Sequence, residues 1–186
     1  QKESKWSRNI RSQTNRLNTL VKQLLSMAQL DENSVQLPKE TMYLSVLLCE
    51  ESEAYAEILR ERGLHFQPQI KRGIEIRGNR EYLKQLVHIL MDNAVQYANE
   101  GGNITLSLDK RALRNRIKLT NTVEHLPSCK PATLFDRFYR DDHSRTQKAG
   151  GCGIGLSAAQ AIVAMHHGKI EAYYTQPNTV VFSVYL

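Results

Sequence analysis

The most informative part of this sequence is the stretch Gly150-Gly151-Cys152-Gly153-Ile154-Gly155-Leu156-Ser157. It places four glycines within six residues, and the apolar run that follows, residues 156–163, has helical character. The stretch therefore predicts a flexible loop that leads directly into an amphipathic helix. Backbone N–H groups at a helix start carry partial positive charge, so such a loop can bind phosphate groups. A glycine turn that only lets a helix pack closely on a sheet is the alternative.

Asn93, in Asp92-Asn93-Ala94, is the second informative residue, because it lies in an earlier apolar helical segment. Its amide oxygen is a suitable ligand for a Mg²⁺ ion held on the same phosphates. The glycine loop is not a P-loop, since no Gly-Lys-Ser/Thr follows it. It also departs from the dinucleotide-binding fingerprint, because Leu156 stands where the third spaced glycine would fall. Its interpretation therefore depends on the rest of the chain.

The composition is that of a soluble globular protein, with 41% hydrophobic and 24% charged residues among 186. No apolar run approaches the roughly 20 residues needed to cross a bilayer. The net charge of +6 indicates an anionic partner, but the basic residues are dispersed and not interleaved with aromatics. This favours nucleotide phosphates or an acidic protein face over direct binding to nucleic acid. The three cysteines lack metal-ligand spacing, so we expect reduced thiols.

Residues 1–31 have the pattern of one long helix, in which Ile10, Leu17 and Leu24 recur every seven residues. A polar helix of about three heptads cannot bury such a seam alone. We therefore expect it to dimerise, or to pack on a helix missing from the N-terminus; packing against its own domain is the alternative. The chain begins within this pattern and without Met, which predicts a fragment of a longer protein.

The remainder predicts an alternation of strands and helices. We expect helices over residues 45–62, from an N-cap at Asn79 to about residue 99, and from the glycine loop to about residue 167. Strands are expected at residues 40–44, 65–70, 74–77, 103–109, 117–120, 169–174 and 180–186, with a basic turn over residues 110–116. The irregular residues 122–153 predict a functional loop or lid. The fold class is an α/β (α+β) two-layer sandwich. It has a mixed sheet of about five strands with about three helices on one face, preceded by one long N-terminal helix.

Three blocks resemble, in this order, the motifs of a known family. Leu90-Met91-Asp92-Asn93-Ala94-Val95-Gln96-Tyr97 resembles an N box, residues 134–140 with Ser144-Arg145 resemble an F box and the start of an ATP lid, and residues 151–157 resemble a second glycine box. The family is the ATP-binding catalytic domain of sensor histidine kinases, in the superfamily that also contains the Hsp90 and MutL ATPases. The resemblance covers about residues 37–186.

The resemblance also implies the domain organisation. Residues 1–32 resemble the second helix of the family's dimerisation and phosphoacceptor hairpin. Residues 33–186 would then form the catalytic domain, with its lid at about residues 122–153. No histidine of the chain is followed by the Glu/Asp and later Pro that mark the family's phosphoacceptor, so the acceptor is expected to be absent and no catalytic residue is assigned.

Within the N box, the resemblance implies that Asn93 ligates Mg²⁺ and that Tyr97 borders the nucleotide. Gln96 stands where the family often has lysine, and a neutral amide attracts phosphate less strongly. A core aromatic position is the alternative for Tyr97.

Two further groups are implied to lie at the phosphates. Lid arginines would supply positive charge in place of the missing lysine, although a solvated position is as good an interpretation for each one. Residues of the second glycine box would bring the backbone close to the nucleotide. These residues are Arg137, Arg140 and Arg145 in the lid, and Gly151, Gly153, Gly155 and Leu156 in the glycine box. Phe135 and Phe138 would anchor the lid on the domain.

One block departs from the family. Where the family has Asp-x-Gly-x-Gly, whose Asp accepts a hydrogen bond from the adenine amino group, this chain has Asn121-Thr122-Val123-Glu124-His125. Asn121 keeps an amide oxygen but loses the charge. Val123 and His125 add bulk beside the base and cannot adopt the conformations of glycine cheaply. ATP would then be held mainly through Mg²⁺, phosphates and lid, or weakly, or not at all.

The leading functional interpretation is the catalytic part of a two-component sensor histidine kinase with ATP and Mg²⁺ as cofactors. Its partners would be a response regulator receiver domain and a second copy, through the N-terminal helix of the full-length protein. The resemblance places it in the cytoplasmic portion of an inner or plasma membrane protein. The alternative is a degenerate module that dimerises or docks a regulator. A third interpretation is a different ATPase of the superfamily, but the heptad helix and the F box argue against it.

Overall fold

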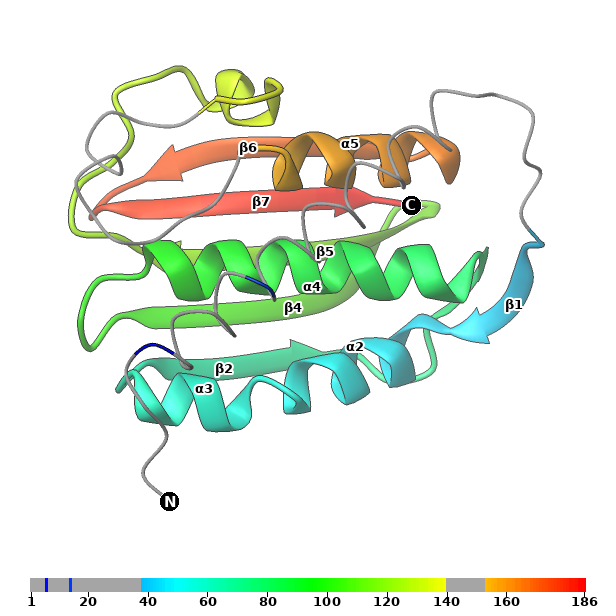
Figure 1. The fold of residues 1–186 in the computed structure, drawn as a ribbon. Coiled ribbons are helices and arrows are strands. Elements are labelled where there is room, and N and C mark those ends of the chain that lie inside the picture. Colours follow the sequence, from blue (N-terminus) through cyan, green and yellow to red (C-terminus); the bar gives the residue numbers. More distant parts are fainter. Residues whose placement is uncertain (1–5, 7–13, 15–37, 140–152) are drawn as a thin grey trace.

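The structure is a computed structural model that describes Trp6, Thr14 and residues 38–139 and 153–186. In chain order its elements are β1 (Glu40–Tyr43), α2 (Leu44–Glu53), α3 (Ala56–Glu61), β2 (His65–Ile70), β3 (Glu75–Gly78), α4 (Arg80–Tyr97), β4 (Asn103–Arg111), β5 (Arg114–Thr122), the 3₁₀ helix η1 (Pro131–Phe135), α5 (Gly155–Met165), β6 (Lys169–Thr175) and β7 (Thr179–Tyr185). They form a sheet layer and a helix layer (Figure 1).

The main sheet has five strands in the order β2-β4-β5-β7-β6. β2 runs parallel to β4, whereas the other neighbours are antiparallel, so the sheet is mixed. Alternate residues of β4, Ile104, Leu106 and Leu108, are buried, as expected for a strand with one face on the core. β1 and β3 pair separately as a two-stranded ribbon. The predicted two-layer sandwich with a mixed five-stranded sheet is confirmed.

The helices cover one face of the sheet, with α4 between the α2–α3 segment and α5 (Figure 1). Asn79 is the N-cap of α4, and its side chain accepts a hydrogen bond from the Tyr82 N–H at 3.1 Å. Leu83, Leu86 and Leu90 recur at helical spacing and are at most 2% exposed. α4 is therefore the central helix of the core, with the start that the sequence predicted.

Two local predictions need correction. The single helix over residues 45–62 is two helices, because the chain turns at Ala54 and Tyr55 between α2 and α3. This turn brings the Tyr55 hydroxyl to Asp92 of α4. The basic turn over residues 110–116 is tighter than predicted, since Ala112 adopts a left-handed φ of 53° and lets the two strands extend to Arg111 and from Arg114. No helix in the described part of the chain is long and apolar enough to cross a bilayer.

The predicted helix over residues 1–31 lies outside the described residues, apart from Trp6 and Thr14, and so does most of the predicted lid. The division into residues 1–32 and 33–186 accordingly stays a prediction. The described part of the lid contains η1 and the segment that leads to Tyr139.

Candidate nucleotide-binding site

The end of α4 and the end of β5 lie at one end of the sandwich (Figure 1). The Asn99 N–H donates a 3.2 Å hydrogen bond to the Thr122 carbonyl, which ties the chain after α4 to the last residue of β5. Asn121, one residue earlier, continues the buried alternation of Ile117 and Leu119 and therefore faces the helix layer. The fold thus brings Asn121 and the N-box helix together.

Asn121 is only 1% exposed, and within the described part of the chain neither its Oδ1 nor its Nδ2 atom has a hydrogen-bond partner. Buried side-chain amides are almost always paired, and an unpaired one costs about 1–3 kcal/mol. Asn115, on the same face of β5, follows the rule, since its Nδ2 donates to the Glu75 carbonyl at 2.8 Å. The unpaired amide of Asn121 is therefore suited to a ligand.

Asn93, Gln96 and Tyr97 share one side of α4, because they are three and four residues apart. Asn93 is half-buried and its side chain makes no hydrogen bond to the described residues, so its amide oxygen is available to a hard cation. Gln96 is half-buried and engaged with a neighbour. Tyr97 is partly buried and packs against the core, which supports the core interpretation of its ring.

α5 starts at Gly155, after Ile154 in the N-cap position, without a side-chain cap and without an acidic residue in its first turn. The N–H groups of this turn consequently lack a competing carboxylate, and the helix dipole favours an anion there. Leu156 packs partly against the core. The Ser157 hydroxyl donates to the Ile154 carbonyl at 2.8 Å and steadies the turn.

Gly153 joins the two ends of the lid segment. The Phe138 N–H donates to the Gly153 carbonyl at 2.9 Å. Gly153 has a φ of +69°, and a Cβ at this position would lie 2.6 Å from the Tyr139 carbonyl oxygen. No other residue fits this position without displacing backbone. The requirement for glycine here is therefore steric as well as conformational.

The two lid phenylalanines differ. Phe135 is buried and packs edge-on against Phe182 of β7, with ring centroids 6.2 Å apart, so it anchors η1 to the sheet. Phe138 is 69% exposed, and the expectation that it also anchors the lid is wrong. Phe138 also adopts a left-handed φ of 65°.

The residues that replace the family's glycines are accommodated without strain. Among the described residues, the left-handed positions include Gly153 and Phe138 but neither Val123 nor His125. Val123 is 7% exposed and its N–H donates to the Asn178 carbonyl at 2.8 Å, whereas His125 is exposed. The expected backbone penalty at Val123 and His125 is therefore absent, and bulk near the site comes from Val123.

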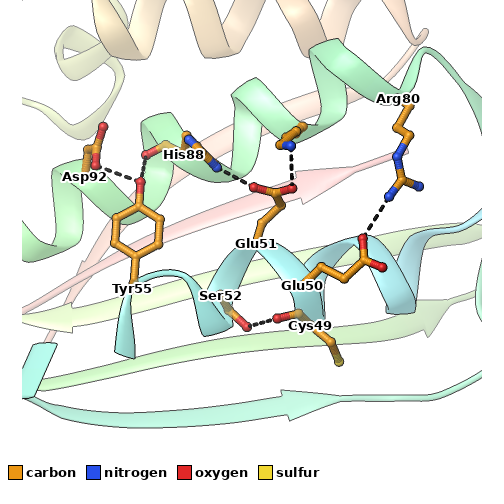
Figure 2. A network of polar contacts seen from close by, with 9 residues as sticks. Cys49, Glu50, Glu51, Ser52, Tyr55, Arg80, His88 and Asp92 are labelled. Carbon is orange, nitrogen blue, oxygen red and sulfur yellow. Dashed lines mark hydrogen bonds and ion pairs between the residues drawn. The ribbon is translucent and has the colours of Figure 1, made fainter. Parts of the chain in front are cut away.

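A polar network holds the opposite side of α4 against α2 and α3, and Figure 2 shows Glu51 and Tyr55 pointing toward this helix. Glu51 pairs with His88 and, at 3.2 Å, with Lys84. The Tyr55 hydroxyl donates to Asp92 Oδ1 at 2.7 Å. Because Asp92 precedes Asn93, the network fixes the rotation of α4 that presents Asn93 to the other side.

The environment of this network shifts two pKa values. Burial alone would raise the pKa of Glu51, but the hydrogen bonds and charges of His88 and Lys84 outweigh it and lower the pKa. Burial, reinforced by the Asp92 carboxylate, raises the pKa of Tyr55 well above its ordinary value of 10.0. These contacts were not predicted, since nothing in a single sequence relates Glu51 and Tyr55 to residues 37 positions away in α4.

Three of the predicted nucleotide-binding residues, Arg140, Arg145 and Gly151, lie outside the described residues. Arg137 is exposed and interacts with a neighbour. Their proposed contacts with phosphate stay predictions, as do those of Gly153, Gly155 and Leu156.

The two-layer sandwich and the uncapped start of α5 are features that a phosphate-binding domain would have, and the comparisons with known proteins identify the family. Residues 78–186 match the family described as histidine kinase-, DNA gyrase B- and HSP90-like ATPase. The chain belongs to this family.

Within it, the chain is similar to sensor histidine kinases. It is 29% identical over 177 residues to the signal transduction histidine-protein kinase BaeS of Escherichia coli, a match that covers 95% of this chain but 38% of BaeS. Two solved structures share its fold. One is ShkA in complex with AMPPNP, with a TM-score of 0.79 and 19% identity over 97% of this chain and 37% of that one. The other is histidine kinase ThkA in complex with the response regulator TrrA, with a TM-score of 0.75 and 22% identity over 98% of this chain and 50% of that one.

Proposed function

We propose that this chain is the catalytic part of a two-component sensor histidine kinase, an ATP-dependent protein-histidine kinase. It binds Mg-ATP and transfers the γ-phosphoryl group to a histidine outside residues 1–186, for relay to a response regulator. The observation that carries the proposal is the buried amide of Asn121, which has no hydrogen-bond partner among the described residues, in a fold that also presents the uncapped start of α5.

Each part of the site has a task. Asn93 holds the metal through its amide oxygen, and the N–H groups of the first turn of α5 bind phosphate oxygens. Asn121 contacts the base from the floor of the site. Mg²⁺ on the phosphates neutralises charge as the γ-phosphoryl group moves. Gly153 keeps the two ends of the lid together, and Arg137 with Arg140 and Arg145 adds positive charge to it.

The partners and location belong to the longer protein, because the chain spans 38% of the length of BaeS. ThkA was solved with a response regulator, and this supports a receiver domain as the downstream partner. ShkA was solved with AMPPNP, and this supports a nucleotide as the ligand of the site. Residues 1–32 would form the second hairpin helix through which the full-length protein dimerises. The chain would be the cytoplasmic portion of an inner or plasma membrane protein.

Calorimetric titration with ATP, with and without Mg²⁺, tests the proposal. We expect Mg²⁺-dependent binding that is lost in Asn93→Ala, because the variant removes a metal ligand and no core contact. Asn103→Ala, which truncates an exposed asparagine of β4, is the matched control and should bind like the wild type. Absence of binding up to millimolar ATP would contradict the proposal.

The second candidate is a docking module that has lost nucleotide binding. Gln96 and Asn121 favour it, because both positions lack a charge that the family often carries there. Thermal unfolding separates the two candidates. A kinase domain is protected by ATP with Mg²⁺ and not by ATP with EDTA, whereas a docking module unfolds at the same temperature in both.

A further inference from the structure

The two hydrogen-bonding groups of Asn121 are side by side, buried and unused. Asn121 is 1% exposed, and no group of the described residues forms a hydrogen bond with either Oδ1 or Nδ2. A carboxamide offers one acceptor and two N–H donors, whereas a carboxylate offers acceptors alone. Because none of the described residues holds the amide, half a turn about its Cβ–Cγ bond exchanges donor and acceptor without breaking a hydrogen bond to them.

This freedom matters for the kind of base the site accepts. The edge of adenine presents a 6-amino donor beside the N1 acceptor. The edge of a 6-oxopurine, such as hypoxanthine or guanine, presents the O6 acceptor beside the N1–H donor. An amide is complementary to both edges, in its two orientations. A carboxylate is not, since it has no N–H to donate to O6 and repels that oxygen.

We propose that Asn121, where the family has a carboxylate, lets this site accept 6-amino and 6-oxo purine nucleoside triphosphates alike. This inference rests on the proposed function, because it requires that the site binds a nucleotide. Asn115 shows that the strand does not need an unpaired amide for its own packing, since that buried asparagine is bonded to the Glu75 carbonyl. Asn121 is therefore better explained by a ligand than by the fold.

The test compares calorimetric titrations of the same chain with Mg-ATP and with Mg-ITP, whose base is hypoxanthine and lacks the 2-amino group of guanine. We expect dissociation constants within about fivefold of each other. Asn121→Asp removes the donor, so we expect it to favour ATP over ITP by about tenfold or more.

Asn121→Leu keeps the shape of the side chain and removes both hydrogen-bonding groups. Without nucleotide, we expect it to unfold at a higher temperature than the wild type, because it removes a buried unpaired amide. It should weaken the binding of ATP and the binding of ITP by similar factors, about tenfold each. Asn115→Leu is the matched control: it breaks the bond to the Glu75 carbonyl and should unfold at a lower temperature. The measurements on Asn121→Leu and Asn115→Leu test the inference even if Asn121→Asp fails to fold.

The outcomes separate this inference from the proposed function. If ATP binds tightly and ITP binds more than about twentyfold more weakly, the inference is overturned and the kinase proposal stays intact. Equal binding of both nucleotides that Asn121→Leu does not change also overturns it, because the base would then not contact Asn121. Failure of both nucleotides to bind overturns the proposed function as well.

Discussion

The Tyr55 hydroxyl donates a 2.7 Å hydrogen bond to Asp92 Oδ1, one residue before the candidate metal ligand Asn93. Tyr55 lies at the turn between α2 and α3 and is 6% exposed, whereas Asp92 is exposed on α4. Successive residues of a helix point about 100° apart. Holding Asp92 against the α2–α3 segment therefore directs Asn93 away from it.

Removal of this hydroxyl should destabilise the domain. Tyr55→Phe is expected to lower the free energy of unfolding by about 2 kcal/mol, since the lost hydrogen bond goes to a charged acceptor. Urea denaturation at neutral pH measures it. Tyr43→Phe is the matched control, because Tyr43 is 53% exposed, and it should change the free energy by less than about 0.5 kcal/mol. Equal effects would mean that the Tyr55–Asp92 bond contributes nothing net.

Glu51 and Glu50 are neighbours on α2 with different surroundings. The Glu51 side chain is 9% exposed and pairs with His88 and Lys84, whereas Glu50 is 52% exposed and pairs with Arg80 (Figure 2). Glu51→Gln is expected to cost about 1–2 kcal/mol of unfolding free energy and Glu50→Gln about 0.5 kcal/mol or less. The same denaturation experiment compares them, and a larger loss for Glu50→Gln would contradict the assignment.

Gly153 can be tested against a glycine with the same backbone conformation. Gly63 has a φ of +63° with open space around it, so Gly63→Ala should cost about 1–2 kcal/mol from the left-handed conformation alone. Gly153→Ala adds a collision with the Tyr139 carbonyl and should weaken Mg-ATP binding, which Gly63→Ala should leave unchanged. Calorimetry on both variants measures this. Unchanged affinity in Gly153→Ala would show that the lid ends are not part of the site.

The surroundings of His166 predict how the free energy of unfolding depends on pH. Its Nε2 accepts a hydrogen bond from the Asn79 N–H at 3.0 Å, so the ring is neutral and its Nδ1 donates to the Ile162 carbonyl at 2.8 Å. Burial lowers the pKa of His166 below its ordinary 6.5, the hydrogen bond to Ile162 opposes this shift, and the charges of Lys39 and His167 reinforce it. Protonation also removes the acceptor for Asn79, the residue that caps α4.

The direction of this pH dependence follows from the lowered pKa of His166. The unfolded chain binds a proton at His166 at a higher pH than the folded chain does, so stability is present above about pH 6.5 and is lost as the pH falls through the folded pKa. Denaturation midpoints between pH 7 and 5 should fall less steeply in His166→Gln than in the wild type. His65→Gln, which changes an exposed histidine, should keep the wild-type slope. An unchanged slope in His166→Gln would contradict the prediction.

Several elements were predictable because their signals are local. The alternation at His65–Ile70 and the cap at Asn79 depend on neighbours within a few residues, and the structure places strand β2 and the start of α4 there. The break at Tyr55 was not predictable, because helix propensity continues through it and a partner in α4 decides it. The absence of strain at Val123 was likewise decided by the path of the chain after β5.

The sequence by itself determined the class of fold and the motifs of the site, since periodicity, capping and glycine content act over short distances along the chain. Only the tertiary structure decided which groups are left without a partner. Asn115 and Asn121 have the same side chain on the same face of one strand, yet the Asn115 side chain is hydrogen-bonded to the Glu75 carbonyl and that of Asn121 has no partner among the described residues. The difference arises because hydrogen-bond satisfaction depends on what packs above each residue, and the elements above β5 come from distant parts of the chain.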